Sequence, residues 1–589
     1  MYTNYELRQM PLSVDSSRRV VEEFLHANGL SLDDLDYYVG VFLKGSDEML
    51  AGAGKKGDVI KCVAVEESQR DEGFTNRIVS HLVNLITSEG YTCVKVFTKP
   101  CYREVFESLA FSLLADTPHA VLLENGHGLA DYRKYLTSRR REGRNGVIVI
   151  NGNPFTRGHR YLVEQAARQV DYLYVIPVKE DASMFSYEER KDMMKDALCD
   201  ITNIDILEGS DYAISAATFP SYFIKKMSNV TESQTMMDLK LFSQHIAPSL
   251  GVSVRFVGSE PTDKLTSYYN ERMRELLPSM GIDVVEIERL RENGNIISAS
   301  RLRRFLADGN LSEAAHLAYS TTIPYLIAHL ATMALQTELD TTPKPGLVDR
   351  HDSGAHHDMD YSLMQRSINT LHPYFVRLAL AGWQKEIPAH EVIQGIGVEC
   401  EEAMLRATGG VNTHKGALFS MGITVVAASH LWYENLITSQ LHNLNITISE
   451  LRQTVSAIAR RFPKSSGTHG SIVTEKYNLK GARDHAIDGY PLLFGEWLPY
   501  YAANKNHDEV NIRTLLLIMS ELEDTNIYYR KDAKTAEDVK RQSRYAFDNY
   551  ALWRMETMND DFIHRNISPG GAADMLSLTI FVNSIIKET

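Results

Sequence analysis

The sequence predicts a multidomain protein in which an α+β domain and an α/β domain precede an all-α domain. Three observations predict this order. The chain has 589 residues, and at about 100–200 residues per domain this length is enough for three or four domains. Strand-like and helical segments alternate through the first half of the chain. Strand-like segments are absent from the sequence pattern after about residue 323.

The first domain is predicted over residues 1–140. Its apolar, strand-like runs lie at residues 37–43, 59–65 and 93–98. A helical pattern covers about residues 75–89, and this mixture is typical of an α+β domain. The charged, glycine-containing stretch at residues 138–146 separates this domain from the next apolar strand and is predicted to be a linker.

The second domain is predicted over residues 141–320. Short apolar strands alternate there with segments long enough to form helices. The strands are expected at residues 147–150, 173–178, 203–207, 252–258 and 283–288. Because strands separated by helices are joined by right-handed crossovers, this pattern predicts a parallel sheet.

The third domain is predicted over residues 321–589 and is expected to be all-α. Apolar residues recur in it at helical spacing. The clearest helical stretches are residues 361–383, 391–408 and 508–524.

The composition excludes several classes of function. Acidic residues outnumber basic ones by 76 to 62, and the net charge of −14 gives no general attraction to nucleic acid or anionic membranes. The five cysteines are scattered without a Cys-x-x-Cys pair, which fits a reducing cytoplasm. The most apolar stretch, residues 323–335, is too short to cross a bilayer, and no signal-peptide pattern opens the chain. We therefore expect a cytoplasmic protein with no nucleic-acid partner and no membrane anchor.

A turn rich in Gly, Asn and Pro follows the first strand of the second domain, and a helix is expected to begin near Gly158. Unpaired N–H groups at a helix start bind phosphate, and the carboxyl ends of parallel strands form a ligand crevice. His159 is expected at the mouth of this crevice. Thr156 to His159 resembles the T/H-x-G-H signature of the nucleotidyltransferase superfamily, in which the imidazole contacts nucleotide phosphates.

A second motif strengthens this interpretation. Residues 297–303 resemble the I-S-x-S/T-x-x-R element of the same superfamily. Its serines can cap a helix that faces phosphate, and Arg303 can neutralise charge on pyrophosphate. The resemblance implies a Rossmann-like fold and catalytic roles for His159 and Arg303. The residues that it implies for ATP binding are Asn151, Asn153, Phe155, Thr156, Gly158, His159, Ser298, Ser300 and Arg303. Simple helix capping is the alternative for the two serines.

The loop at residues 69–75 resembles the loop by which GNAT-fold proteins hold the pyrophosphate of coenzyme A. Backbone N–H groups at the following helix start would form the cradle. The resemblance implies a GNAT-like fold and assigns the binding of a CoA-derived arm to Arg70, Gly73 and Thr75. Thr75 stands where Gly or Ala is usual, and a docking module without a ligand is the alternative.

Taken together, residues 1–320 resemble the citrate lyase ligase family. The resemblance implies that ATP activates acetate to acetyl-adenylate and releases pyrophosphate. The acetyl group then passes to the prosthetic-group thiol on the acyl carrier subunit of citrate lyase. Because that prosthetic group is a dephospho-CoA derivative, the GNAT-like domain is expected to bind it.

Polar motifs interrupt the predicted helices of the third domain. They occupy residues 342–349, 354–360, 409–416, 467–470, 523–526 and 568–574. Asp349, Asp358 and Asp360 supply hard oxygen ligands suited to Mg²⁺ that carries a triphosphate. The residues expected to contact ATP are Lys344, Asn412, His414, Lys415, Asp524 and Asn526. Each of these residues could instead be a cap or turn residue.

These motifs, over residues 323–589, resemble the triphosphoribosyl-dephospho-CoA synthase family. The resemblance implies that ATP and 3′-dephospho-CoA form 2′-(5″-triphosphoribosyl)-3′-dephospho-CoA and adenine. Because the N-glycosidic bond of ATP breaks, Asp349, Asp358 and Asp360 are candidates to deprotonate the attacking hydroxyl or to stabilise the ribosyl cation. Tyr529 stands where the family often has a histidine.

The two resemblances together predict a bifunctional enzyme, because both activities concern the same dephospho-CoA derivative. ATP is the expected substrate of both halves, with Mg²⁺, and acetate, 3′-dephospho-CoA and the lyase acyl carrier subunit are the other expected partners. Two alternatives remain open. One is a pantetheine- or nicotinamide-type adenylyltransferase fused to a helical ATP-binding domain, and the other is a non-catalytic factor that assembles the lyase.

Overall fold

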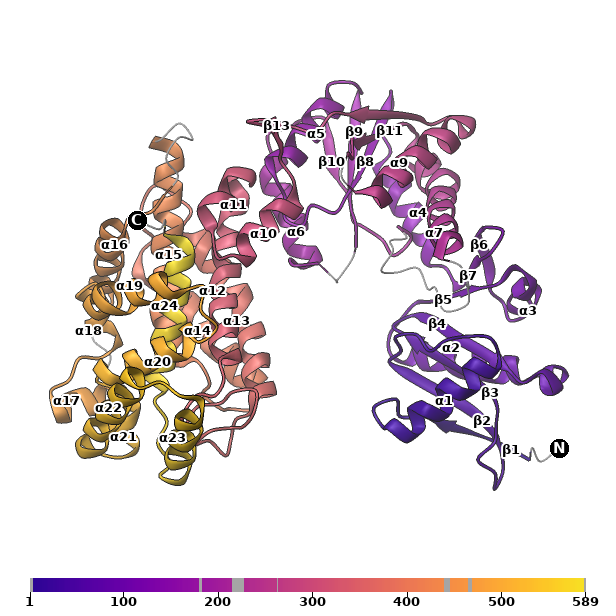
Figure 1. Cartoon of the computed structure of the whole chain (residues 1–589). Coiled ribbons are helices and arrows are strands. Elements are labelled where there is room, and N and C mark those ends of the chain that lie inside the picture. Colours follow the sequence, from indigo (N-terminus) through magenta and orange to yellow (C-terminus); the bar gives the residue numbers. More distant parts are fainter. Residues whose placement is uncertain are drawn as a thin grey trace. The chain divides into compact units, whose positions relative to one another are not determined.

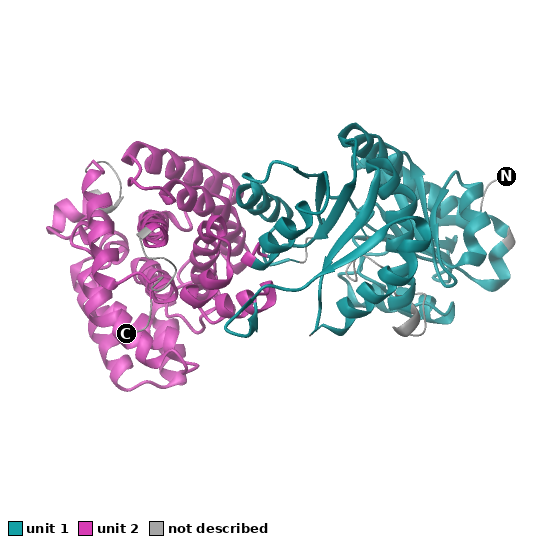
Figure 2. Cartoon of the chain, turned by 90° about the horizontal axis from the view of Figure 1, so that it is seen from above, with its two compact units in different colours: residues 1–153, 158–296 teal, residues 154–157, 297–589 magenta. Residues whose placement is uncertain are grey.

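Figure 1 shows the fold of the chain as a computed structural model. The chain divides into two compact units, which Figure 2 colours separately. The first unit contains residues 1–153 and 158–296, and the second contains residues 154–157 and 297–589. The structure describes residues 4–179, 183–213, 227–261, 263–438, 445–463 and 469–586.

The first unit begins with a seven-stranded mixed sheet in the order β1-β2-β3-β4-β5-β7-β6. Strands β4 and β5 pair in parallel, whereas the other neighbouring pairs are antiparallel. The strands are β1 (Tyr5–Gln9), β2 (Tyr37–Leu43), β3 (Met49–Lys56), β4 (Val59–Val65), β5 (Cys93–Thr98), β6 (Ser112–Asp116) and β7 (Val121–Gly126). The helices of this region are α1 (Asp15–Ala27), η1 (Glu67–Glu72), α2 (Phe74–Ser88), η2 (Pro100–Tyr102) and α3 (Arg103–Ser108).

Helix α2 packs against this sheet along one stripe of apolar residues. Phe74, Ile78, Leu82 and Ile86 are buried and recur every four residues, which places them on one side of the helix. They share a core with buried strand residues that include Val39, Val41, Val94 and Val96. The helix that the sequence predicts over residues 75–89 is therefore confirmed.

A second sheet in the same unit has five parallel strands in the order β10-β9-β8-β11-β12. The predicted parallel sheet is therefore present. Its strands are β8 (Asn145–Ile150), β9 (Tyr172–Pro177), β10 (Ile204–Ile206), β11 (Val252–Gly258) and β12 (Asp283–Ile287). The accompanying helices are α4 (Gly128–Arg139), α5 (Arg157–Ala167), α6 (Tyr187–Leu198), α7 (Met227–Leu241), η3 (Phe242–Ile246), α8 (Ala247–Leu250), α9 (Lys264–Leu276) and η4 (Leu277–Met280). A short antiparallel pair, β13 (Arg291–Glu292) and β14 (Asn295–Ile296), follows.

The stretch at residues 138–146, between α4 and β8, is an anchored connection. The phenolic oxygen of Tyr174 accepts a hydrogen bond from the Arg141 N–H at 2.8 Å and donates one to the Arg139 carbonyl at 3.0 Å. Gly143 has a φ of 103°, and a Cβ there would collide with the Asp171 carboxylate. The connection between the two sheets thus has a defined conformation.

The second unit is helical, as the sequence predicts, and no named strand lies among its described residues. Helix α12 packs against α13 and α24, and α15 packs against α13. The helices are α10 (Ala299–Ala307), α11 (Leu311–Leu317), η5 (Ser320–Thr322), α12 (Ile323–Asp340), α13 (Tyr361–Gly382), α14 (His390–Ala407), α15 (Lys415–Thr438), α16 (Ile448–Arg461), α17 (His469–Tyr477), α18 (Ala482–Ile487), η6 (Leu493–Trp497), α19 (Leu498–Asn504), α20 (Val510–Glu521), α21 (Thr525–Arg530), α22 (Ala533–Asp548), α23 (Leu552–His564) and α24 (Gly570–Ile585).

One segment of α15 is long and apolar enough to cross a membrane by length and composition alone. It covers Lys415–Ile437, and 78% of its most apolar window is buried inside the protein. A core helix of a soluble protein passes the same test, and the burial of α15 fits that role.

Replacing Leu82 by Ala should destabilise the first sheet by about 2–5 kcal/mol, because a fully buried side chain would leave a cavity under α2. Hydrogen–deuterium exchange should then be faster in α2 and β5. The matched control is Leu43→Ala at an exposed position of β2. Equal acceleration by both substitutions would contradict the packing described for α2.

Candidate functional sites

The first candidate site lies where β8 ends. Strand β8 stands between β9 and β11, so the strand order reverses at its carboxyl end, and ligands of open parallel sheets bind at such a point. A turn follows, and α5 begins at Arg157. His159 lies in the first turn of α5 and is half-buried. The structure therefore brings His159 to the end of the sheet at which the sequence analysis expects it.

The turn after β8 is shaped by a fully buried arginine of α6. Arg190 donates to the carbonyl and side-chain oxygens of Asn151, both at 2.8 Å, and to the carbonyl of Val178 at 2.9 Å. Because a guanidinium presents several N–H donors in a rigid plane, it fixes these loop oxygens together. The side-chain oxygen of Asn153 accepts from the Phe185 N–H at 3.2 Å. Asn151 and Asn153 thus support the turn, and sequence reasoning missed Arg190.

The next residues of the motif, Phe155 and Thr156, pack within the second unit. The Phe155 carbonyl accepts from the Thr322 hydroxyl at 3.0 Å. Thr156 is 1% exposed and forms a β-bridge with Ala318. Both residues are therefore structural supports of this segment, whereas the half-buried Gly158 and His159 belong to the first unit.

The second motif opens α10 in the second unit. The Ser298 hydroxyl caps this helix by accepting from the Arg301 N–H at 3.3 Å. Ser300 lies in the first turn, where its hydroxyl accepts from the Arg303 guanidinium at 3.4 Å. Partial burial lowers the pKa of Arg303. Helix capping is thus observed for Ser298, and Ser300 holds the arginine.

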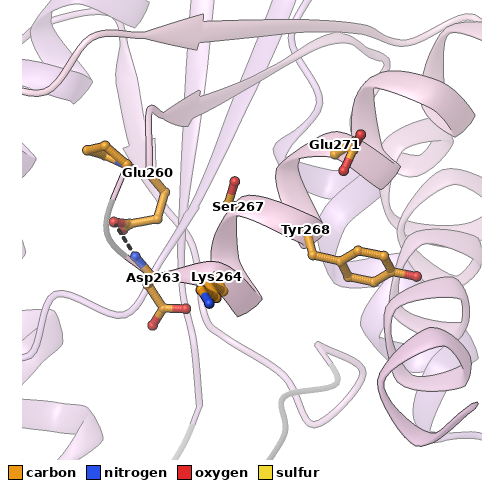
Figure 3. Close-up of a pocket in the computed structure, with 7 residues that line it drawn as sticks. Glu260, Asp263, Lys264, Ser267, Tyr268 and Glu271 are labelled. Atoms are coloured by element: carbon orange, nitrogen blue, oxygen red, sulfur yellow. Dashed lines mark hydrogen bonds between the residues drawn. The ribbon is translucent and has the colours of Figure 1, made fainter. Parts of the chain in front are cut away.

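A polar pocket lies beyond the carboxyl end of β11 (Figure 3). The Asp263 carboxylate caps α9 by accepting from the N–H groups of Leu265 and Thr266 at 2.8 and 3.0 Å. Glu260 accepts from the Asp263 N–H at 3.1 Å, as Figure 3 shows. The pocket is lined by Glu260, Pro261, Asp263, Lys264, Ser267, Tyr268 and Glu271. The loop that follows β11 therefore places polar side chains at this end of the sheet.

The residues expected to hold a CoA-derived arm lie between β4 and α2. Gly73 has a φ of 73°, which favours glycine, and no atom would obstruct a Cβ there. Arg70 is exposed and pairs with Glu67 at 3.7 Å. Thr75 lies in the first turn of α2, which has no side-chain cap. The loop thus presents an uncapped helix start.

The second candidate site is a buried polar centre in the helical unit. Lys344 is 1% exposed, pairs with Glu338 of α12, and donates its backbone N–H to the Asp349 carboxylate at 2.9 Å. The charge of Lys344 also acts on His414. The motifs at residues 342–349 and 409–416 are therefore neighbours. Sequence reasoning missed Glu338. A single carboxylate among the apolar residues on one side of α12 is a signal that could have found it.

His414 has a buried ring nitrogen available for a ligand. Its Nδ1 lies 2.8 Å from the Ser367 hydroxyl, whereas its Nε2 has no hydrogen-bond partner among the described residues. Burial and the charge of Lys344 lower the pKa of His414 to about 3, so the imidazole is neutral at pH 7. Because a buried polar atom without a partner is costly, this nitrogen is suited to a substrate or a water molecule.

Two carboxyl groups complete the centre. Asp524 accepts from the N–H groups of Asn526 at 2.9 Å and Ala572 at 3.0 Å, and burial raises its pKa to about 6. Asp574 of α24 lies so close to Gly416 that a Cβ there would collide with it. Burial, together with the charges of Asp524 and Glu338, raises the pKa of Asp574 well above its usual value. Asp574 lies in the sequence motif at residues 568–574, which by itself predicts no role for it.

The three aspartates expected to bind a metal lie in different settings. Asp349 accepts from the N–H groups of His351 at 2.7 Å and Asp352 at 3.2 Å. Asp360 caps α13 by accepting from the Leu363 N–H at 2.7 Å. The Asp358 side chain is 64% exposed. No group of three His, Cys, Asp or Glu side chains that could hold a metal lies in the described parts of the chain.

The remaining expected contacts lie at helix starts. Asn412 caps α15 by accepting from the Lys415 N–H at 3.2 Å, and the Lys415 ammonium pairs with Glu401. Asn526 is exposed, and its amide faces Gly570. Residues 467 and 468 of another motif lie outside the described residues.

The motif at residues 354–360 also reaches this region. His356 Nε2 lies 2.8 Å from the Ser568 hydroxyl, and His356 Nδ1 lies 3.2 Å from a guanidinium nitrogen of Arg530. Asn559 holds the preceding loop by accepting from the Gly346 N–H and donating to Asp352, both at 2.9 Å. Motifs far apart in the sequence therefore meet at the start of α24.

Comparison with known families finds two matches in the chain, which meet near residues 324–326. The profile of the citrate lyase ligase C-terminal domain matches residues 145–326, and that of the ATP:dephospho-CoA triphosphoribosyl transferases matches residues 324–589. The citrate (pro-3S)-lyase ligase of Escherichia coli K12 is 41% identical over 334 residues, which are 55% of this chain and 95% of that protein. The ligase of Haemophilus influenzae is 40% identical over 315 residues, 52% of this chain and 94% of that protein.

The other half of the chain matches a different kind of protein. The "Probable 2-(5″-triphosphoribosyl)-3′-dephosphocoenzyme-A synthase" of Azotobacter vinelandii is 34% identical over 271 residues. The match covers 44% of this chain and 90% of that protein. Nearly complete relatives of two kinds are thus found within one polypeptide.

Replacing Lys344 by Met should destabilise the helical unit by about 3–5 kcal/mol, because Glu338 would remain buried without its cation. Calorimetry of the full chain should show the unfolding transition of this unit at a lower temperature. The double variant Glu338→Leu/Lys344→Met removes both charges and should recover most of the loss. Equal melting of the single and double variants would argue against the buried pair.

Proposed function

The chain belongs to the citrate lyase ligase family in its N-terminal part and to the triphosphoribosyl-dephospho-CoA synthase family in its C-terminal part, and we propose that it performs both reactions. It is thus a bifunctional enzyme of citrate lyase maturation. The observation that carries this proposal is the match to two nearly complete relatives, at 95% and 90% of their lengths. An adenylyltransferase of another type would not account for either match.

The proposed ligase reaction begins with acetate and ATP. The acetate oxygen attacks the α-phosphorus, pyrophosphate leaves, and acetyl-adenylate forms. A thiol on the prosthetic arm of the lyase acyl carrier subunit then attacks the acetyl carbonyl, and AMP leaves. His159 would stabilise charge at the α-phosphate and Arg303 would neutralise pyrophosphate. The place of His159 in the first turn of α5, after β8, supports its role.

We assign residues 141–320 to a Rossmann-like nucleotidyltransferase domain and residues 1–140 to a GNAT-like domain. The strand order β10-β9-β8-β11-β12 supports the first assignment, because it is that of a doubly wound sheet. The parallel β4–β5 pair inside an otherwise antiparallel sheet supports the second. Arg70, Gly73 and Thr75 would hold the phosphates of the prosthetic arm at the uncapped start of α2.

We assign residues 321–589 to the synthase reaction. The ribose hydroxyl of 3′-dephospho-CoA attacks C1′ of the ATP ribose, the bond from C1′ to adenine N9 breaks, and adenine leaves. The proton lost by the hydroxyl balances the proton gained by adenine. The polar centre formed by Lys344, His414, Asp524 and Asp574 supports this assignment, because it offers a ring nitrogen without a hydrogen-bond partner among the described residues and a carboxyl group whose pKa burial raises well above its usual value.

We propose that Mg²⁺ arrives bound to the phosphates of ATP. Few protein ligands are needed for such an ion, because Mg²⁺ keeps several waters and is usually held through one or two carboxylates and the phosphates. The separate settings of Asp349, Asp358 and Asp360 favour this form over a metal cage built by the protein. Both reactions would take place in the cytoplasm, where ATP and dephospho-CoA are available.

Replacing His159 by Ala should lower acetate-dependent ATP–pyrophosphate exchange by about 10²–10³-fold, because one donor to the transition-state charge is lost. Adenine release from ATP and 3′-dephospho-CoA should be unchanged in the same preparation. Unchanged exchange would instead favour a non-catalytic assembly role for the N-terminal part.

Replacing His414 by Ala should impair the synthase reaction and spare the ligase reaction, which is the reverse of the result expected for His159→Ala. Adenine release that depends on 3′-dephospho-CoA, followed by chromatography, should fall by at least about tenfold because the free Nε2 is lost. Pyrophosphate exchange should be retained. His372→Ala is a matched control, since this histidine of the same unit already bonds the Thr332 hydroxyl through Nδ1 at 2.8 Å. Full adenine release by His414→Ala would remove His414 from the site.

A further inference from the structure

Three residues from distant parts of the sequence form a continuous series of hydrogen bonds in the helical unit. A guanidinium nitrogen of Arg530, the last residue of α21, lies 3.2 Å from His356 Nδ1. His356 Nε2 lies 2.8 Å from the hydroxyl oxygen of Ser568, two residues before α24. None of these three residues was expected from the sequence to act in the site.

The direction of this chain follows from the chemistry of arginine. A guanidinium has N–H donors and no acceptor, so His356 Nδ1 must accept the hydrogen bond from Arg530. The ring proton of a neutral imidazole then lies on Nε2. Nε2 therefore donates to the Ser568 oxygen, and Ser568 cannot use His356 as the acceptor of its own proton.

One competing arrangement is visible. The Asp358 carboxylate lies 3.9 Å from His356 Nδ1. If the ring proton lay on Nδ1, the direction of these hydrogen bonds would be reversed, and the Ser568 hydroxyl would donate to Nε2. That arrangement is the one in which a histidine activates a serine as a nucleophile. The distances favour Arg530, which is within hydrogen-bond range, over Asp358, which is beyond it and largely exposed.

The proton of the Ser568 hydroxyl is left for another acceptor. Ser568 is 3% exposed, and its only hydrogen bond among the described residues is the one to His356. A buried donor without an acceptor is costly, so the site is incomplete without a group that accepts this proton. The acceptor should be anionic. The series of hydrogen bonds begins at the positively charged guanidinium of Arg530, and donors assisted by a positive charge bind anions most strongly.

We propose that Arg530, His356 and Ser568 form a one-way chain that presents the Ser568 hydroxyl proton to a phosphate oxygen of a substrate of the helical unit. The proposal rests on the proposed synthase function, whose two substrates, ATP and 3′-dephospho-CoA, both carry phosphates. Ser568 is the binding residue, and His356 and Arg530 are positioning residues. No covalent step at Ser568 is involved.

Three substitutions of His356 test the direction of the chain. In His356→Gln the amide oxygen can accept from Arg530 while the amide nitrogen donates to Ser568, so the direction is kept. His356→Glu offers acceptors only and should capture the Ser568 proton, and His356→Leu breaks the chain. We expect His356→Gln to retain the KM values, and the other two, like Ser568→Ala, to raise one KM by about tenfold with a smaller change in kcat.

The identity of the substrate whose KM rises distinguishes the two sources of phosphate. A rise for ATP alone places the triphosphate at Ser568, and a rise for 3′-dephospho-CoA alone places its pyrophosphate there. Acetate-dependent pyrophosphate exchange, which belongs to the other half of the chain, should be unchanged, and calorimetry should show the unfolding transition of the helical unit at the temperature of the unsubstituted protein. Unchanged KM values for both substrates in Ser568→Ala would overturn the proposal.

The position of the ring proton of His356 can also be observed directly by NMR. In the full chain labelled with ¹⁵N-histidine, the His356 resonances are identified by their loss in His356→Gln. We expect the ¹⁵N shifts of a neutral ring with its proton on Nε2. A proton on Nδ1 would overturn the proposal and would instead make Ser568 an activated nucleophile.

Discussion

The polar centre of the helical unit depends on one buried carboxylate. Asp524 accepts backbone N–H groups from the start of α21 and from the start of α24, at 2.9 and 3.0 Å. The first N–H groups of a helix have no partner within the helix, so one carboxylate satisfies two helix starts together. This junction also places three further polar residues, because α21 ends at Arg530, α24 carries Asp574, and Ser568 lies two residues before α24. The raised pKa of Asp524 is the cost of placing this anion away from water.

In the first unit a buried cation holds a loop in place, whereas the helical unit uses a buried carboxylate. At the end of β8, loop oxygens need donors, and the buried guanidinium of Arg190 supplies several from one plane. In both units a single buried side chain determines the shape of a loop. Other side chains are then free of that task, as His414 illustrates, whose Nε2 has no hydrogen-bond partner among the described residues.

Much of the architecture could be predicted from the sequence, because hydrophobic periodicity is a local signal. The stripe on α2, the parallel strands from β8 to β12 and the helical C-terminal part follow from it directly. The site residues were harder to predict, because a sequence motif does not show whether a residue contacts a ligand or holds a loop in place. Asn151, Asp349 and Asp360 have their side-chain oxygens engaged by the protein itself. Asp574 and the His356–Ser568 contact depend on burial or on a neighbour 212 residues away in sequence, which no local pattern encodes.

The path of the chain near residues 154–157 has a consequence for how this fusion could be separated into its parts. These four residues pack within the second unit, through the Thr156–Ala318 bridge, the Thr322–Phe155 hydrogen bond and a 2.8 Å hydrogen bond from Arg157 to the His316 carbonyl. A gene split at residue 296 would separate the histidine-bearing loop from all three supports. An independently expressed ligase would therefore have to extend through η5, and the match to the ligase family likewise continues to residue 326. Helices α10 and α11 lie in the second compact unit but within the ligase match, so the boundary between the two family matches lies later in the chain than the boundary between the two units.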